Sequence, residues 1–287
     1  MRSDALRRVV ATSGVDDLVD VLARLPGADL TTLLLAVTER RAGDLAPADV
    51  LRQATTDRFV QPASIDGRAL HDLEVRVLAA LPTAFEAVVL SPLSPLGTHS
   101  TLATVSQHKV VTTVRRTDVA ADPTNALAIE AARRRAGQRS GALRLAAIQR
   151  VVRAQQGEGT AHFGLCGLVT AGRTSGQHRF EAAALTEHVQ AIVDLATAGG
   201  ATDLEVAITD LGVGLTPTVR GATVRDDPSR TSGRGYYRDV CFKVQGVVAG
   251  QRRELADGGA TDWTARLLGD RKERLFISGL GLDRLLG

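Results

Sequence analysis

Two apolar segments, 147–154 and 163–171, separated by a short glycine-containing loop, constrain the fold of this chain more than any other feature. Two such runs joined by a short loop predict an antiparallel hairpin. Other hairpin-like strand pairs occur along the chain, mixed with helix-like stretches. This mixture favours an α+β fold with a mostly antiparallel sheet flanked by helices over a doubly wound parallel sheet.

The remaining elements follow from the spacing of apolar residues. Apolar positions three and four apart predict helices, and short β-branched runs bounded by turn residues predict strands. We expect helices over 15–25, 30–41, 68–81, 123–135, 179–198 and 263–268, a further turn of helix after Ala46, and a last helix at the C-terminus. We expect further strands over 85–90, 109–115, 204–209, 237–247 and 273–278.

Turn-forming residues at 61–67, Gln-Pro-Ala-Ser-Ile-Asp-Gly, interrupt the pattern after the first short helices. We therefore predict a helical N-terminal segment over 1–60 and a main domain over 61–287. The sequence leaves open whether the N-terminal segment covers a site, recruits a partner or completes the core.

Composition narrows the class of protein. A chain of 287 residues that is 44% hydrophobic can bury a full core. It has no apolar run long enough for a membrane span and no signal-peptide core, so we expect a cytoplasmic protein without a membrane partner. Cys166 and Cys241 lie in apolar runs, which suits buried thiols, and the histidines show no metal-ligand spacing. We expect no protein-bound metal site. The net charge of +3 comes mainly from arginine and permits RNA binding without favouring it.

The predicted hairpin carries residue types that suit a nucleotide. A strand periodicity of two places Arg153 and Gln155 on one face, and Phe163 returns on the partner strand. A guanidinium can bind a phosphate, an amide can bind a base edge, and an aromatic ring can stack on a base. The alternative is an edge hairpin whose Arg153 and Gln155 face water.

The C-terminal segment 279–287 places an arginine on a glycine-bounded apolar turn. Burial of Leu282, Leu285 and Leu286 would aim Arg284 inward, where a guanidinium needs an anionic partner. The alternative is an amphipathic helix end with Asp283 and Arg284 both in water.

Six segments in order carry a family resemblance: 85–92, 122–124, 143–155 with its return 162–172, 235–242, 258–263 with 267–269, and 281–285. They resemble, in turn, motif 1, the segment that holds the amino acid, motif 2, the histidine-specific tyrosine pair, the second histidine-specific segment and motif 3. Residues 73–287 therefore resemble the catalytic domain of class II aminoacyl-tRNA synthetases of the histidyl-tRNA synthetase type. The resemblance ends at motif 3, so we expect no anticodon-binding domain.

The resemblance implies a site for ATP, with Mg²⁺ assisting. Arg153 would hold the α-phosphate, Phe163 would stack on adenine and Arg284 would meet the γ-phosphate, while Gln155 and Asp283 would complete the ATP site. The residues implied to contact the substrate are Asp122, Thr124, Tyr236, Tyr237, Gly258, Gly259 and Asp262. The resemblance also implies a homodimer, because the motif 1 strand and the helix before it form the subunit interface in this family.

Several departures change the expected activity. Gln155 replaces the usual acid, and the loop 156–161 has no arginine. Leu165 and Val169 replace the polar residues that grip histidine, so free histidine is not the expected substrate. The arginine usual four residues before the tyrosine pair falls at Ser232, although Arg230 or Arg234 could reach the same space if the loop is shifted. A second possible register makes Arg116-Thr-Asp118 the motif 2 pair.

Two functions remain open from the sequence. The first is activation of an amino acid or related carboxylate as an acyl adenylate, without full tRNA charging. The second is a non-catalytic synthetase paralogue that regulates a metabolic enzyme through a protein partner, as the synthetase-like regulatory subunit of ATP phosphoribosyltransferase does. Whether the chain contacts tRNA is left undecided.

Overall fold

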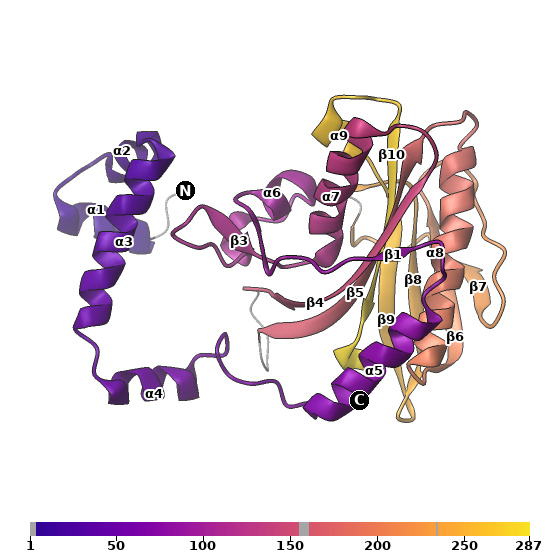
Figure 1. Cartoon of the computed structure of the whole chain (residues 1–287), viewed down its shortest axis with the longest axis horizontal. Coiled ribbons are helices and arrows are strands. Elements are labelled where there is room, and N and C mark those ends of the chain that lie inside the picture. Colours follow the sequence, from indigo (N-terminus) through magenta and orange to yellow (C-terminus); the bar gives the residue numbers. More distant parts are fainter. Residues whose placement is uncertain (1–3, 155–160, 234) are drawn as a thin grey trace.

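The computed structural model describes residues 4–154, 161–233 and 235–287, and its main feature is a sheet of eight strands (Figure 1). β1 pairs with β4 and β6 pairs with β7 in parallel, and the other neighbours are antiparallel. The spatial order is β1 (Glu86–Ala87), β4 (Leu143–Val152), β5 (His162–Arg173), β10 (Glu273–Gly281), β9 (Gln251–Thr261), β8 (Tyr237–Val248), β6 (Thr202–Asp210) and β7 (Thr223–Asp226). The predicted α+β fold with a mostly antiparallel sheet is confirmed.

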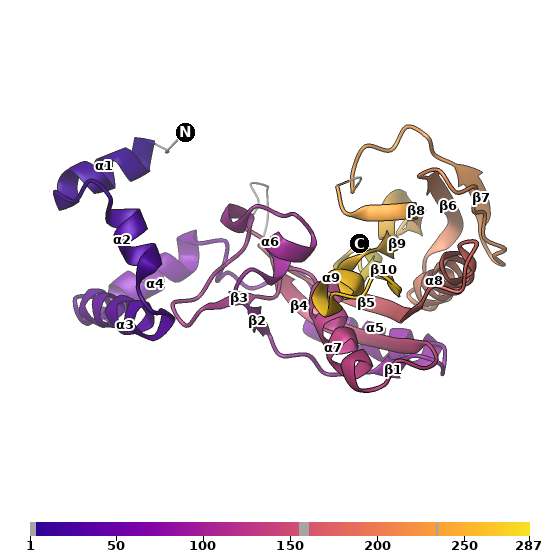
Figure 2. The ribbon, with the colours of Figure 1, turned by 90° about the horizontal axis from the view of Figure 1, so that it is seen from above.

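Helices cover both faces of this sheet (Figures 1 and 2). α8 (Arg179–Ala198) packs on one face together with α5 (Gly67–Ala80), while α7 (Pro123–Gly137) and α9 (Trp263–Leu268) pack on the other. The strands are apolar on both sides, and alternate residues enter two separate core clusters. On β10, for example, Phe276 lies in the α8 cluster, whereas Leu275 and Ile277 lie in the α7 cluster.

The N-terminal helices extend away from the sheet, as Figures 1 and 2 show. They are α1 (Asp4–Ser13), α2 (Leu18–Arg24), α3 (Gly27–Gly43) and α4 (Pro47–Thr56). None of the described residues in these four helices is buried, so the segment does not complete the core. The chain that follows meets the β4–β5 hairpin: Ala161 N–H donates to Arg58 O at 3.1 Å, and His162 Nε2 lies 2.7 Å from Gln61 O. The division at residue 60 stays a prediction.

No helix in the part of the chain that the structure describes combines the length and apolar character needed to cross a membrane.

The strand expected over 109–115 is wrong. Residues Gln107–Lys109 form a short 3₁₀ turn, η1, and the strand that follows is β3 (Thr117–Val119). β3 pairs with β2 (Leu93–Pro95), which precedes the short helix α6 (Thr98–Leu102) in the chain. The chain reverses direction between these points, because Thr113 N–H donates to Thr117 O at 2.8 Å and Arg116 has a φ of 59°. A tight turn thus divides the β-branched run that predicted one strand.

Three other expectations differ from the structure. Strand β9 was missed: it follows β8 through Ala249 and Gly250, whose positive φ values of 48° and 76° form the tight reversal of a hairpin. The strand expected over 85–90 is reduced to the two residues Glu86–Ala87, followed by one hydrogen bond from Val88 N–H to Ala146 O at 2.8 Å. The expected C-terminal helix is a single 3₁₀ turn, η2 (Asp283–Leu285).

Candidate functional site

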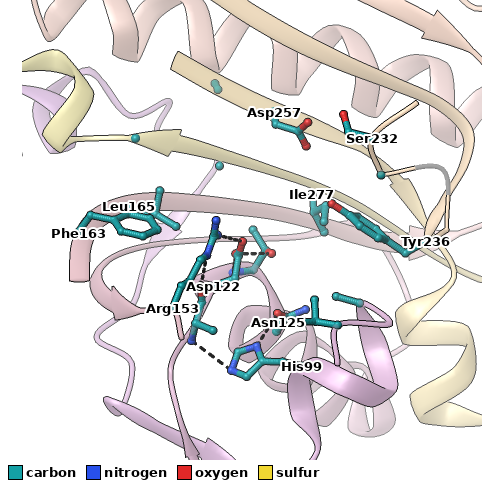
Figure 3. A pocket seen from close by; sticks show the side chains of 18 of the residues that line it. His99, Asp122, Asn125, Arg153, Phe163, Leu165, Ser232, Tyr236, Asp257 and Ile277 are labelled. Carbon is teal, nitrogen blue, oxygen red and sulfur yellow. Dashed lines mark hydrogen bonds and ion pairs between the residues drawn. The ribbon is translucent and has the colours of Figure 1, made fainter. Parts of the chain in front are cut away.

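A cavity of about 590 Å³ opens on the face of the sheet that carries α7 and α9. Its walls come from β5, β8, β9 and β10, from the start of α7, and from η2. Figure 3 shows side chains from these elements arranged around it. Eight residues that the sequence assigned to the site line this cavity together: Asp122, Thr124, Arg153, Phe163, Tyr236, Tyr237, Asp283 and Arg284.

Arg153 and Phe163 lie beside each other at one side of the cavity (Figure 3). The Arg153 guanidinium carbon is 5.0 Å from the centroid of the Phe163 ring, within range of a cation–π interaction. Arg153 Nε donates to Ala121 O at 2.9 Å, and a terminal nitrogen binds Asp122 Oδ2 at 3.1 Å. These contacts fix the guanidinium plane while leaving 37% of the side chain exposed.

Asp122 connects this arginine to the start of α7. Its Oδ1 accepts hydrogen bonds from Thr124 N at 2.9 Å and Thr124 Oγ1 at 2.7 Å, which caps the helix. Pro123 occupies the first helical turn, where no backbone donor is needed. The predicted pair Asp122 and Thr124 is therefore held rigidly at the cavity wall.

A cluster of Arg230, Tyr237 and Asp257 forms the opposite wall, and its Arg230 and Tyr237 side chains are buried. Arg230 and the Tyr237 hydroxyl both donate to the Asp257 carboxylate, and the Arg230 side chain is only 2% exposed. Burial raises the pKa of Asp257, although Arg230 opposes this shift, and it also raises the pKa of Tyr237 well above its usual value. Tyr237 thus stays protonated and donates. Gly259 leaves room for its ring, because a Cβ there would lie 2.7 Å from it.

Tyr236 and Trp263 add an aromatic part to the same wall. The Tyr236 ring centroid lies 4.4 Å from that of Tyr237 and 5.8 Å from that of Trp263. Burial, with a smaller effect of Asp257, raises the pKa of Tyr236 to about 12. Its hydroxyl is therefore a neutral hydrogen-bonding group at physiological pH.

The C-terminal turn places Asp283 and Arg284 at the rim. Asp283 Oδ1 accepts from Gly164 N–H at 2.8 Å, and its Oδ2 lies 3.3 Å from Arg150. Leu282 and Leu285 are buried as expected, but Arg284 is not aimed inward, since 54% of its side chain is exposed. The turn is too short to bury it, and the guanidinium donates to Glu254 O at 2.6 Å instead.

Three predicted residues lie away from the described lining of the cavity. Gly258 and Gly259 are in the middle of β9, where their lack of a side chain accommodates the rings of Phe242 and Tyr237. Asp262 pairs with Arg238 at 3.2 Å. Gln155 falls outside the described residues.

The alternative motif 2 pair, Arg116 and Asp118, is also absent from the described lining of the cavity. Arg116 lies in the turn before β3 and is not among the described lining residues. Asp118 is fully buried, and it accepts hydrogen bonds from Gly97 N–H at 2.9 Å and from Gln107 at 2.8 Å. It holds this small sheet together.

Sequence reasoning missed part of the lining. Asp257 lies on the unpredicted strand β9, and so does Glu254, whose carboxylate binds Lys243 at 2.7 Å. His99 and Asn125 were also missed. Asn125 follows Thr124 directly, so its place at the helix start was the one available signal.

Outside the cavity, the described part of the chain brings three possible metal ligands close together. One ligand atom each from His178, Glu181 and Asp239 lies within 4.8 Å of the others. Glu181, however, is buried and already neutralised by Arg274, whose Nε lies 2.9 Å from its carboxylate. A cation there would compete with this guanidinium.

Comparison with solved structures identifies the fold class of the chain. No protein-family model and no curated protein matches the sequence. Among solved structures, the chain is similar to an ATP phosphoribosyltransferase regulatory subunit/histidyl-tRNA synthetase from Bacillus halodurans, with a TM-score of 0.63, 14% identity, and coverage of 79% of this chain and 81% of that one. The chain has the fold of a class II aminoacyl-tRNA synthetase catalytic domain.

Two further structures share this class II fold. A histidine–tRNA ligase subunit from Alicyclobacillus acidocaldarius gives a TM-score of 0.62 at 11% identity, covering 79% of this chain and 95% of that one. Pyrrolysyl-tRNA synthetase from Desulfitobacterium hafniense gives 0.53 at 16% identity, covering 83% and 73%. The resemblance seen in the sequence motifs is thus confirmed at the level of the class II fold.

Proposed function

We propose that this protein binds ATP and activates an amino acid or related carboxylate as an acyl adenylate. The observation that carries the proposal is the pairing of Arg153 and Phe163 at one side of the cavity, with the guanidinium 5.0 Å from the ring centroid. A nucleotide offers both a planar base and a phosphate chain, and these two side chains suit one each. The class II fold of the chain supports the same function.

The chemistry would need positioning and charge more than covalent catalysis. A carboxylate oxygen of the substrate attacks the α-phosphorus of ATP, the bond from that phosphorus to the bridging oxygen breaks, and pyrophosphate leaves with the electron pair. Negative charge grows on the α-phosphate oxygens, and a guanidinium already fixed by Ala121 O and Asp122 stabilises it without reorganising. Mg²⁺ would arrive bound to the phosphates of ATP and neutralise the leaving group.

The carboxylate substrate would bind beside Arg153, at the start of α7. Asp122 and Thr124 lie next to Arg153, so an amino acid held there has its carboxylate close to the α-phosphate. Leu165 and Ile277 line the cavity beyond them with apolar surface. An imidazole side chain would lose its hydrogen bonds to water against these residues, so the substrate we propose is not histidine.

A second function is a non-catalytic regulator of a partner enzyme. The specific observation in its favour is that Asp122 already neutralises Arg153. An arginine paired in this way attracts a phosphate less strongly than an unpaired one. The similar Bacillus halodurans protein is named as a regulatory subunit as well as a synthetase, which supports this alternative and a protein partner.

The test is exchange of labelled pyrophosphate into ATP, screened over amino acids and related carboxylates. We expect exchange with at least one compound, and a loss of about 100-fold or more in Arg153→Ala, the scale of losing one transition-state donor. Arg238→Ala is the matched control, because Arg238 pairs with Asp262 at 3.2 Å away from the cavity lining. Absence of exchange, with no rise in melting temperature on adding ATP, would refute ATP activation and binding.

We also propose a homodimer. Apolar side chains on α5 and just after β1 are exposed: Val75 is 54% exposed, Leu78 is 44% exposed and Val89 is fully exposed at 102%. These exposed apolar side chains support the proposal, because a subunit interface would remove them from water. Sedimentation at micromolar protein should give a dimer, and Val89→Lys should shift it towards monomer.

A further inference from the structure

The described lining of the cavity carries five cationic side chains and four carboxylates. Each carboxylate already pairs with a cation: Asp122 with Arg153 at 3.1 Å, Glu254 with Lys243 at 2.7 Å, Asp283 with Arg150 at 3.3 Å, and Asp257 with Arg230. Lys109 is the lining cation that no carboxylate of the described residues pairs with. The cavity therefore has positive charge left over for an anionic ligand.

Lys109 lies on the side of β4 towards which the Arg153 guanidinium turns. Val152 N–H donates to Ala120 O at 2.8 Å, and Ala154 N–H donates to Lys109 O at 3.1 Å. These two N–H groups are two residues apart on an extended chain, so they point to the same edge. Arg153 Nε donates to the carbonyl oxygen of the residue after Ala120, at 2.9 Å. Lys109 and the guanidinium are thus neighbours at the end of β4 that carries the proposed ATP site.

A ligand can reach the Lys109 ammonium, because the residue is exposed. Its backbone is held at both ends, since Lys109 N–H donates to Ser106 O at 2.8 Å and Lys109 O accepts from Ala154. Most exposed lysines are simply solvated. Lys109 differs in lining a cavity whose described carboxylates are all paired, beside an arginine whose charge Asp122 already offsets.

We infer that the Lys109 ammonium binds the phosphate chain of ATP alongside Arg153. This inference rests on the proposed function, because it takes the cavity to hold ATP. The triphosphate carries several negative charges, and Arg153 shares its own charge with Asp122. An ammonium on a flexible four-carbon stem can follow the phosphates, whereas the Arg153 guanidinium is fixed in place. Lys109 would then help to offset the charge that moves onto pyrophosphate as it leaves.

Acetylation of lysines by an amine-selective reagent, read by mass spectrometry, tests this contact in the unaltered protein. The chain has three lysines, Lys109, Lys243 and Lys272, so each is followed separately. At about ten times its dissociation constant, ATP should slow acetylation of Lys109 about tenfold, because about nine-tenths of the protein is occupied. Inorganic tripolyphosphate should also protect Lys109, and adenosine should not. Lys272 is the internal control, because it is exposed and is not among the described lining residues.

Substitution measures what the ammonium contributes to binding. Lys109→Gln should weaken ATP binding about tenfold in calorimetric titration, the scale of one hydrogen bond between charged groups. Lys109→Arg should restore most of the affinity, and neither change should alter the affinity for adenosine. The unliganded melting temperature should not change, because the side chain is exposed. Lys272→Gln removes a matched charge away from the cavity lining and should leave ATP binding unaltered.

The outcomes separate this inference from the proposed function. ATP that raises the melting temperature without protecting Lys109 would refute the contact and leave ATP binding intact. Protection of Lys109 by adenosine, or by amino acids and related carboxylates without ATP, would assign its charge to another part of the ligands and overturn the inference. An ATP affinity unchanged in Lys109→Gln would do the same. No effect of ATP on either measurement would refute both proposals. Protection without pyrophosphate exchange would keep Lys109 as a phosphate ligand and refute the enzyme.

Discussion

Two buried histidines lie on opposite faces of the sheet, and their hydrogen bonds end differently. On the α8 face, His188 is fully buried, with Nδ1 2.8 Å from Ser278 Oγ and Nε2 3.0 Å from Thr170 Oγ1. Thr170 in turn donates to Glu187 at 2.9 Å. On the cavity face, a relay runs from His99 Nδ1 to Asn125 Oδ1 at 2.8 Å and stops at Asn125 Nδ2, which has no hydrogen-bond partner among the described residues.

The difference separates a polar network that is complete within the described chain from one that ends in an unpartnered donor. Thr170 uses its proton on Glu187, so it accepts from His188 Nε2–H, and Ser278 is left to donate to Nδ1. Every member is satisfied within the protein, and we call this a closed network. We call the His99–Asn125 relay an open network, because Asn125 Nδ2 has no hydrogen-bond partner among the described residues. Changes in a closed network should cost stability, because they leave a buried polar group without its partner.

The largest expected loss of stability comes from Asp257, which belongs to a closed network on the cavity wall. Asp257→Asn removes the charge that balances Arg230, whose side chain is 2% exposed. Loss of this carboxylate from a buried guanidinium, which keeps its hydrogen bonds to Ser232 O and Phe242 O, should lower the free energy of unfolding by about 3 kcal/mol. Urea denaturation measures this loss. A change below about 1 kcal/mol would show that the open cavity, and not Asp257, solvates the guanidinium.

A second prediction concerns acid and the closed network of His188. Burial, with a smaller effect of Arg144, lowers the pKa of His188 from its ordinary value of 6.5 to about 3. The folded protein therefore binds this proton less readily than the unfolded chain, and the stability that the neutral ring confers is lost as the pH falls from about 6.5 towards 3. Between pH 7 and pH 5 the loss from this group should be about 2 kcal/mol.

Urea melts at several pH values measure that slope, and His188→Leu supplies the control. The leucine variant should have a flatter dependence over the same range, whatever its stability at pH 7. An unchanged slope would assign the acid sensitivity to other groups.

The sequence predicted those parts of the fold that local patterns determine. The β4–β5 hairpin follows from two apolar runs around a glycine-containing loop, and α8 from a long apolar periodicity that the structure reproduces at Arg179–Ala198. Strand β9 was missed because its first half is charged and its second half contains Gly258 and Gly259, both poor strand signals. β9 is stabilised by pairing with β8 on one side and β10 on the other, although its residues have low strand propensity.

The site was predictable where a residue's role depends on its own strand or helix cap. Arg153 and Phe163 face each other because β4 and β5 pair, and Asp122 caps α7 through Thr124. Contacts between distant segments were not predictable in this way. Asp257 meets Tyr237 only because β8 and β9 pair, and Arg135 on α7 is 1% exposed because it pairs with Glu273 on β10.

A third prediction uses the closed contact of Asp283. Its carboxylate joins η2 to the start of β5 through Gly164 N–H and Arg150, at 2.8 Å and 3.3 Å. Asp283→Ala should lower the free energy of unfolding by about 1 kcal/mol, the usual net value of a charge-assisted hydrogen bond at a partly exposed site. Chemical denaturation checks this, and a larger loss of ATP binding than of stability would show that Asp283 also contacts the nucleotide.

The smallest expected effect on stability belongs to Arg284, the neighbour of Asp283 on the same turn. Its side chain is 54% exposed and lies 3.9 Å from the Glu254 carboxylate, so this ion pair is weak in water. Arg284→Ala should change the free energy of unfolding by less than about 0.5 kcal/mol. If Arg284 binds the terminal phosphate of ATP, the same variant should weaken ATP binding by about tenfold in a thermal-shift titration. Arg252→Ala is the matched control, because Arg252 is also exposed and also pairs with a carboxylate, that of Asp203. Equal effects of the two variants on both measurements would place Arg284 among the solvated ion pairs, whereas a loss of ATP binding without a loss of stability would assign Arg284 a contact with the nucleotide.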